Sequence, residues 1–158
     1  MQHKILISVD ESKNSLSAVQ YVANIVRPDK VKITLINILD TPPDLDSQPT
    51  IHPFFKSKLQ ELKGQSGIQQ KLIEQVLGEY CNILCAAGIP KDSVQTRIEK
   101  VRDGIAKDII SEAKEGQYDT LVIGRRGVTG MEKILLGSIS SKIVKSIKNC
   151  SVWIIDKQ

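Results

Sequence analysis

The chain has 158 residues, a length that suits one domain, and we expect a single domain over residues 1–158. Apolar residues make up 41% and charged residues 25%, which is typical of an ordinary globular protein with a sizeable core. The net charge of +4 comes from lysines spread along the chain and aromatic residues are only 4%, so this composition argues against nucleic acid as a partner.

The opening segment predicts a strand followed by a helix. Lys4–Val9 is a short β-branched run, Asp10–Ser12 supplies turn and capping residues, and Ser15–Val26 places apolar residues at helical spacing. The first apolar run is too short for a secretory signal, and no later run approaches membrane-spanning length. We therefore expect a cytoplasmic protein without a membrane partner.

The second crossover is unusually long. Val31–Leu39 predicts a strand, and prolines at 42, 43, 49 and 53 keep residues 40–53 out of regular structure. Phe54–Ala87 predicts mostly helix with a break near residues 64–67, which contain two glycines. The sequence leaves open whether the loop 41–53 is a lid over a ligand or a plain connector.

The second half of the chain continues the alternation of strand and helix. Further strands are predicted at Val94–Val101, Thr120–Ile123 and Ser151–Ile155, with helices at Gly104–Glu115 and 138–148. We predict an α/β fold: a single open five-stranded parallel sheet, Rossmann-like, with helices on both faces and strand order 3-2-1-4-5.

Glycines surround the turn that follows the fourth predicted strand. Gly124 and Gly127 flank two arginines, and Gly137 with Ser138 comes just before a helical pattern. Glycine lets main-chain N–H groups approach an anion closely, and the start of a helix carries partial positive charge. The spacing indicates a phosphate site, although a glycine turn also occurs in α/β proteins as tight-turn chemistry alone.

Asp10 ends the first predicted strand. In the expected strand order the switch point lies between strands one and four, so Asp10 and the Gly124 loop would border one pocket. A carboxylate repels phosphate, which makes ribose hydroxyls, base N–H groups or a metal its natural partners. Asp10 is equally well explained as the cap of the following helix.

The spacing Gly-x2-Gly-x9-Gly-Ser, from Gly124 to Ser138, resembles the ATP-binding signature of the universal stress protein family. Segments 5–12, 35–40, 119–124 and 135–140 extend this resemblance along nearly the whole chain, including its fold of the adenine nucleotide α-hydrolase type. The chain departs from the family in two places: Asn149–Ser151 replaces the usual proline before the last strand, and Asn37 replaces a frequent histidine.

The resemblance implies specific contacts to ATP. Asp10 would lie near the adenosine, the main chain at Ile38 near the adenine edge, and the helix start at Gly137 near the outer phosphates. Apart from the resemblance, Arg125 and Arg126 could neutralise phosphate charge, although arginines in a loop are more often solvated. The expected nucleotide-binding residues are Asp10, Ile38, Gly124, Arg126, Gly127, Gly137, Ser138, Ile139 and Ser140.

Other reactive side chains have simpler explanations. Cys81 and Cys85 lie one helical turn apart, but too few further ligands accompany them for a zinc site, so we expect two buried, reduced thiols. His3 and His52 lack a nucleophile motif and are expected at the surface. Three cysteines, an odd number, argue against a disulfide framework.

Three classes of function remain. We favour a nucleotide-dependent regulatory module for the stress response that binds ATP with Mg²⁺ or Mn²⁺ through the phosphates and forms a homodimer through the apolar strand 151–156. The alternative is an enzyme that slowly hydrolyses ATP or transfers adenylate; no P-loop, pyrophosphatase loop or general base supports it, and we assign no catalytic residue. A scaffold with an empty pocket is the third. The sequence does not distinguish AMP, ADP and ATP.

Overall fold

The computed structural model describes residues 2–40, 51–63, 67–125 and 136–156. The strands are β1 (His3–Ser8), β2 (Val31–Leu39), β3 (Val94–Lys100), β4 (Thr120–Gly124) and β5 (Ser151–Ile155). The helices are α1 (Lys13–Ile25), α2 (Pro53–Leu62), α3 (Ile68–Ala86), α4 (Ile105–Glu115) and α5 (Ser138–Ser146), with short 3₁₀ turns at Pro28–Lys30 and Lys91–Ser93.

All five strands pair in parallel, in the order β3-β2-β1-β4-β5. β1 lies at the centre, where Ile5 is paired with Ile33 of β2 and with Thr120 of β4. The predicted open parallel sheet and its strand order are confirmed. Parallel strands require a crossover over one face after each strand, and the four crossovers here provide the helices.

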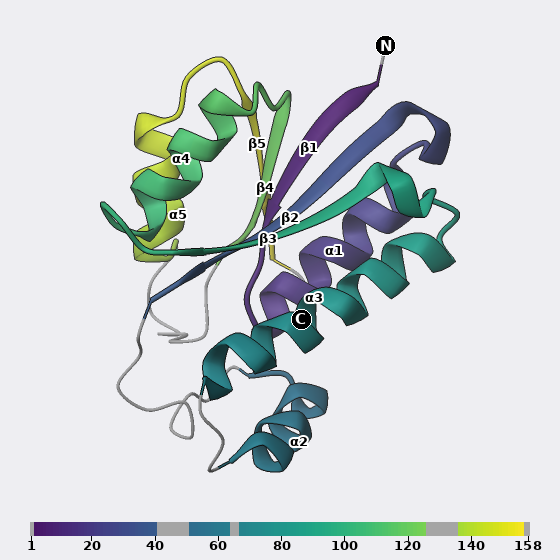
Figure 1. The fold of residues 1–158 in the computed structure, drawn as a ribbon. Coiled ribbons are helices and arrows are strands. Elements are labelled where there is room, and N and C mark those ends of the chain that lie inside the picture. The colour runs from purple at the N-terminus through teal and green to yellow at the C-terminus, as the bar shows by residue number, and fades with distance from the viewer. Residues whose placement is uncertain (1, 41–50, 64–66, 126–135, 157–158) are drawn as a thin grey trace.

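Two layers of helices cover the sheet (Figure 1). Side chains alternate along β1, so that Ile5 and Ile7 enter the core beneath α1, α2 and α3, whereas Leu6 enters the core beneath α4 and α5. Burial on both faces explains why β1, β2 and β4 are nearly continuous apolar runs. Within the described ranges, no helix is long and apolar enough to cross a membrane.

The second crossover, from β2 to β3, contains two helices, α2 and α3. The predicted break near residues 64–67 falls between them. Pro53 was expected to lie in the loop but is the first residue of α2, where a proline is favoured because its missing N–H would have no intrahelical partner. Ile51 before it is buried and bridges to Ser12, so the end of this connection packs against the start of α1. Gly124, expected in the loop, is the last residue of β4.

The turn between α4 and β4 is tightly packed around one aromatic ring. The hydroxyl of the buried Tyr118 hydrogen-bonds with Thr34 Oγ1 at 2.9 Å and lies 3.3 Å from Glu112 Oε1, and Glu112 also pairs with Arg97 of β3. A Cβ atom added at Gly116 would lie 2.2 Å from Cε2 of this ring. The turn therefore has no room for a side chain at position 116.

Two glycine substitutions test this packing. We expect Gly116→Ala to lower the free energy of unfolding by about 1–3 kcal/mol, because the Tyr118 ring is held by its hydrogen bonds and cannot move aside. Gly78→Ala on α3 is the matched control: an added Cβ meets nothing within 4 Å, and the change should stabilise the helix by about 0.5–1 kcal/mol. Urea denaturation measures both, and equal stabilisation by the two changes would contradict the steric argument.

Candidate functional site

The carboxyl ends of β1, β2 and β4 meet at one edge of the sheet. Asp10 follows β1, Asp40 follows β2, and Gly124 ends β4. The crossover from β1 leads to β2 on one side, whereas the crossover from β3 leads to β4 on the other side of β1, so the switch point lies between β1 and β4. In sheets of this type, ligands bind beyond the carboxyl ends of the strands at such a point.

Helix α5 begins at this edge and is hydrogen-bonded to the end of β4. Gly137 is its N-cap, and the Gly137 N–H donates to the Arg125 carbonyl at 3.0 Å. The Ser140 hydroxyl donates to the Gly124 carbonyl at 3.0 Å and lies 3.2 Å from the Arg125 carbonyl. The main-chain N–H groups of residues 138–140 have no acceptor inside the helix, so they form its partly positive end.

These contacts determine which atoms of the residues expected to hold phosphate could meet a ligand. The Ser140 side chain is 4% exposed and bonded to main-chain carbonyls, and the Ile139 side chain packs against the core beneath α4 and α5. Both could therefore meet a ligand only through their main-chain N–H groups, whereas Ser138 is exposed. Arg126 and Gly127 lie outside the described residues.

Arg125 forms a main-chain hydrogen bond and an ion pair with other residues of the protein. Its main-chain N–H donates to the Ile155 carbonyl at 2.9 Å, and its guanidinium pairs with the Asp156 carboxylate. Its buried Nε atom has no hydrogen-bond partner among the described residues. Arg125 therefore ties the end of β4 to the end of β5, and its pairing with Asp156 explains the arginine without a phosphate contact.

Asp10 is not the cap of the following helix. The N-cap of α1 is Ser12, whose side chain accepts from the Ser15 N–H at 3.1 Å. Asp10 Oδ1 instead accepts from the Ser12 N–H at 2.9 Å and from the Ser15 hydroxyl at 2.7 Å. The described residues donate no hydrogen bond to the other carboxylate oxygen, which leaves Oδ2 of this half-buried residue able to accept from a ligand.

Two buried side chains hold the main chain at Asp10. The hydroxyl of Tyr80 on α3 donates to the Asp10 carbonyl at 2.8 Å, and its fully buried ring packs edge-on against Phe55 of α2. Asn37 on β2 donates through Nδ2 to the Val9 carbonyl at 2.8 Å, which gives a structural role to the residue that stands in place of the family's histidine. The second crossover is thereby connected directly to the edge of the sheet.

Glu11 is a buried carboxyl group beside Asp10. The residue is 6% exposed, and burial, followed by the charge of Asp10, raises the pKa of Glu11 from 4.5 to about 7. Its carbonyl accepts from the His52 N–H at 3.1 Å, next to the bridge between Ser12 and Ile51. This burial could not be predicted from the sequence, because a glutamate in a turn is usually solvated.

The remaining reactive residues lie elsewhere. Cys81 and Cys85 are half-buried on α3, not buried as expected, because this face of the helix is only partly covered; burial and the neighbouring Cys85 raise the pKa of Cys81. His3 is exposed, and its Nε2 atom lies 2.8 Å from Thr120 Oγ1. His52 was expected at the surface but is half-buried, because it caps α2 through Nδ1.

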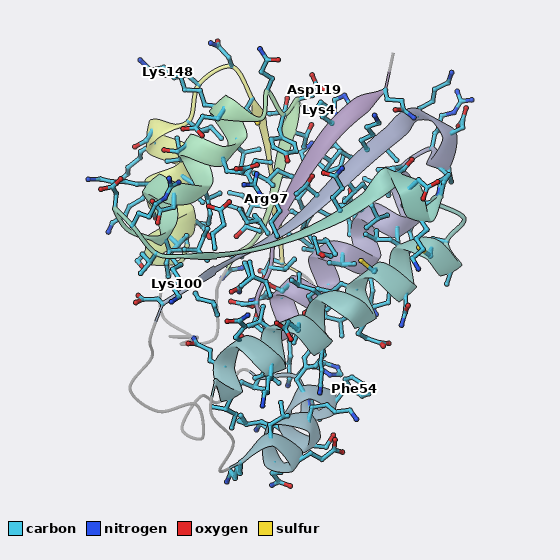
Figure 2. All side chains as sticks on the ribbon, in the orientation of Figure 1. Lys4, Phe54, Arg97, Lys100, Asp119 and Lys148 are labelled. Carbon is cyan, nitrogen blue, oxygen red and sulfur yellow. The ribbon has the colours of Figure 1, made fainter. Side chains whose placement is uncertain are left out.

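A second polar cluster lies at the opposite end of the sheet. The Lys4 N–H donates to Asp119 Oδ2 at 2.7 Å, and the Lys4 ammonium lies 5.2 Å from the Tyr118 ring centroid. Figure 2 shows Lys4 and Asp119 near the amino ends of the strands, far from Phe54 on α2. The described ranges contain no group of three or more His, Cys, Asp or Glu residues arranged to hold a metal ion.

Sequence comparison agrees with the resemblance. A sequence model of the "Universal stress protein family" matches residues 1–156. Universal stress protein MJ0531 of Methanocaldococcus jannaschii is 26% identical over 154 residues, which cover 98% of this chain and 82% of that protein.

Solved structures share the fold. Universal stress protein UspA from Lactobacillus plantarum matches with a TM-score of 0.72 and 22% identity, over 98% of this chain and 97% of its own. A universal stress protein in complex with cAMP matches with a TM-score of 0.63 and 21% identity, over 98% and 96%. A family member from Arabidopsis thaliana with AMP bound matches with a TM-score of 0.63 and 17% identity, over 99% and 92%.

The burial of Glu11 predicts a stability that depends on pH. Below pH 4.5 the carboxyl is neutral in both the folded and unfolded chain; as the pH rises to about 7 the unfolded chain loses this proton first, and the folded state loses stability. Glu11→Gln removes the titration, so at about pH 8 the variant should be more stable than the parent by on the order of 3 kcal/mol.

Denaturant unfolding across this range measures the difference, and the two proteins should converge below pH 4.5. A difference that stays constant with pH would show that Glu11 is not a buried titrating group.

Proposed function

Since the chain belongs to the universal stress protein family, we propose that it binds an adenine nucleotide, ATP, at the carboxyl edge of its sheet and acts as a regulatory module. The single observation that carries the proposal is the junction of β4 and α5. There the Gly137 N–H and the Ser140 hydroxyl fasten the first turn of α5 against the end of β4, at the switch point of the sheet.

The first turn of α5 is suited to phosphate. The N–H groups at Ser138, Ile139 and Ser140 precede the first residue with an intrahelical acceptor, since the Ser141 N–H donates to the Gly137 carbonyl. Unpaired N–H groups and the helix dipole together favour an anion at such an end. Gly137 carries no side chain to keep the anion at a distance.

The Asp10 side of the edge is suited to the nucleoside. Its oxygen Oδ2 could accept a hydrogen bond from a ribose hydroxyl, because Oδ1 is already held by Ser12 and Ser15. Ile38 could contribute only through its main chain, since its side chain is buried beneath α4 and α5. Similar structures with bound cAMP and AMP support an adenine nucleotide as the ligand class.

A divalent cation would be held mainly by the phosphates. The described residues bring Asp10 and Asp40 to this edge but form no group of three or more potential metal ligands. Mg²⁺ characteristically keeps several waters and binds through substrate phosphates, and Mn²⁺ also accepts oxygen ligands. We therefore propose that Mg²⁺ or Mn²⁺ accompanies ATP without a site made by the protein alone.

We also propose that two copies pair through residues 151–156. β5 is an edge strand, Ile154 is 38% exposed, and Val144 of the adjoining α5 is 46% exposed. An apolar edge strand with unpaired main-chain groups is prone to pair with another chain. The opposite edge strand, β3, exposes Gln95, Thr96 and Arg97 and is protected by its polar side chains.

Substitution at the start of α5 tests nucleotide binding. Gly137 has φ −62°, which valine can adopt, so we expect Gly137→Val to leave the fold intact and to lower ATP affinity at least tenfold through steric exclusion of phosphate. Ser138→Ala keeps the main-chain N–H and should lower affinity only about two- to threefold. Calorimetric titration with ATP and Mg²⁺ measures both, and full affinity in Gly137→Val would place the phosphates elsewhere.

The nucleotide that co-purifies with the protein tests the regulatory role. Mass spectrometry of a denatured, undialysed preparation should find ATP at near-stoichiometric levels. Recovery of ADP or AMP would instead favour an enzyme that turns ATP over. Absence of nucleotide, together with no heat on titration, would contradict the site itself.

The dimer is tested at the two edges of the sheet. Ile154→Lys places a charge on the apolar edge and should convert the dimer to a monomer at micromolar concentration, because burying an unpaired ammonium in the new interface is costly. Thr96→Lys, at an exposed position of the other edge, should leave the dimer unchanged. Light scattering gives the mass, and a monomeric parent protein would contradict the proposal directly.

A further inference from the structure

The carboxyl group of Glu11 is buried beside the proposed nucleotide site and forms no ion pair with any other residue that the structure describes. The residue is 6% exposed. Burying an ionised carboxylate without a partner is costly, and such groups take up a proton instead. Glu11 is therefore poised to exchange a proton with solvent near neutral pH, in agreement with its pKa of about 7.

Among residues 2–40, 51–63, 67–125 and 136–156, the groups around Glu11 offer repulsion and no ion pair. The neighbouring Asp10 carboxylate is held in place by the Ser12 N–H and the Ser15 hydroxyl. Tyr80 on α3 faces both acids; burial, then Asp10 and Glu11, raise its pKa well above 10.0, so it is neutral. From the α2 side, His52 gives Glu11 a main-chain N–H, and its ring Nδ1 accepts from the Phe54 N–H at 3.3 Å.

The cationic side chain next in the chain does not change this balance. Lys13 begins α1 directly after the cap and is exposed. A solvated ammonium is well hydrated and screened, so it contributes little to a group in the interior.

We propose that nucleotide binding is coupled to proton uptake by Glu11, so that the protein binds nucleotide more tightly below neutral pH than above it. The inference rests on the proposed function and concerns the regulation of that same site. Phosphate brings negative charge to the edge where two adjacent carboxyl groups already lie, and these like charges repel. A proton from solvent on a Glu11 oxygen removes one of them.

Thermodynamic linkage makes the effect reciprocal. If phosphate raises the proton affinity of Glu11, protonation of Glu11 must raise the affinity for phosphate by the same factor. Glu11 acts as a positioning residue, because the charge of its carboxyl group affects the phosphate without touching it. Its main-chain carbonyl is already bonded to the His52 N–H. We expect about a fivefold change in affinity, which equals about 1 kcal/mol at 1.36 kcal/mol per tenfold.

The probe for the experiment is cAMP, whose single phosphodiester keeps one charge across the range. A terminal phosphate, as in AMP, itself titrates near pH 6 and would obscure the effect. Calorimetric titrations at about pH 6 and about pH 8, in two buffers of different ionisation enthalpy, give both the affinity and the number of protons taken up.

The parent protein should bind cAMP about fivefold more tightly at about pH 6 and take up a fraction of a proton near neutral pH. Glu11→Gln, which cannot titrate, should bind equally at both pH values without proton uptake. The matched control is Glu115→Gln, at an exposed position of α4, which should keep the pH dependence of the parent. Denaturant unfolding of Glu11→Gln confirms that the variant is folded.

Different failures have different meanings. If the parent binds cAMP with equal affinity at both pH values, or if Glu11→Gln keeps the dependence, the coupling is wrong and the nucleotide site stands. If neither cAMP nor ATP binds the parent at either pH, the proposed function is wrong and the coupling falls with it.

Discussion

The parallel pairing of β1 with both β2 and β4 is the constraint on which the rest of the structure depends. It delivers every carboxyl end to one edge, and the hydrogen-bond ladder continues past the strands there: the Val9 N–H donates to the Ile36 carbonyl and the Arg125 N–H to the Ile155 carbonyl, each at 2.9 Å. Segments distant in sequence therefore approach one another with their main chains in fixed positions. In the proposed function, this rigidity would let main-chain N–H groups recognise the ligand without long side chains.

Buried polar side chains hold the main chain at the carboxyl edge of the sheet in place. Tyr80, Asn37 and Ser140 each donate from a buried position to a main-chain carbonyl next to the site. Buried donors that are satisfied in this way fix one arrangement of the backbone. Glu11 differs, because its burial lowers the stability of the fold progressively from pH 4.5 to about 7 and fully above that range. A destabilising group retained next to a binding site is consistent with a function that outweighs its cost in stability.

Much of the fold was predictable from the sequence, whereas the support of the site was not. Runs such as Val31–Leu39 identify buried strands directly, and glycines near residue 64 indicate the break between α2 and α3. The capping pattern at the start of α1 was ambiguous, since Asp10 and Ser12 both suit that position and only the structure selects Ser12. Phosphate contacts could be expected from Gly137, because glycine spacing is a local signal.

Contacts between distant segments leave no such signal. Tyr80 reads as one more large residue on the buried stripe of α3, and its hydroxyl reaches Asp10 only because α3 packs beside α1 and against β2 and β3. Ser140 reads as a small polar residue near a phosphate loop, yet its hydroxyl is used to hold β4. Burial of Glu11 likewise depends on where His52 and α2 pack, which is a property of the tertiary structure.

The last strand also gives the protein a built-in optical reporter. Trp153 is the only tryptophan in the chain and lies half-buried on β5, in register with Val122 of β4 and against the core beneath α1. Its fluorescence therefore senses one edge of the sheet, while circular dichroism senses all the helices. Agreement between the two signals during denaturation would show that β5 unfolds cooperatively with the rest, and an earlier change in fluorescence would show that this edge opens first.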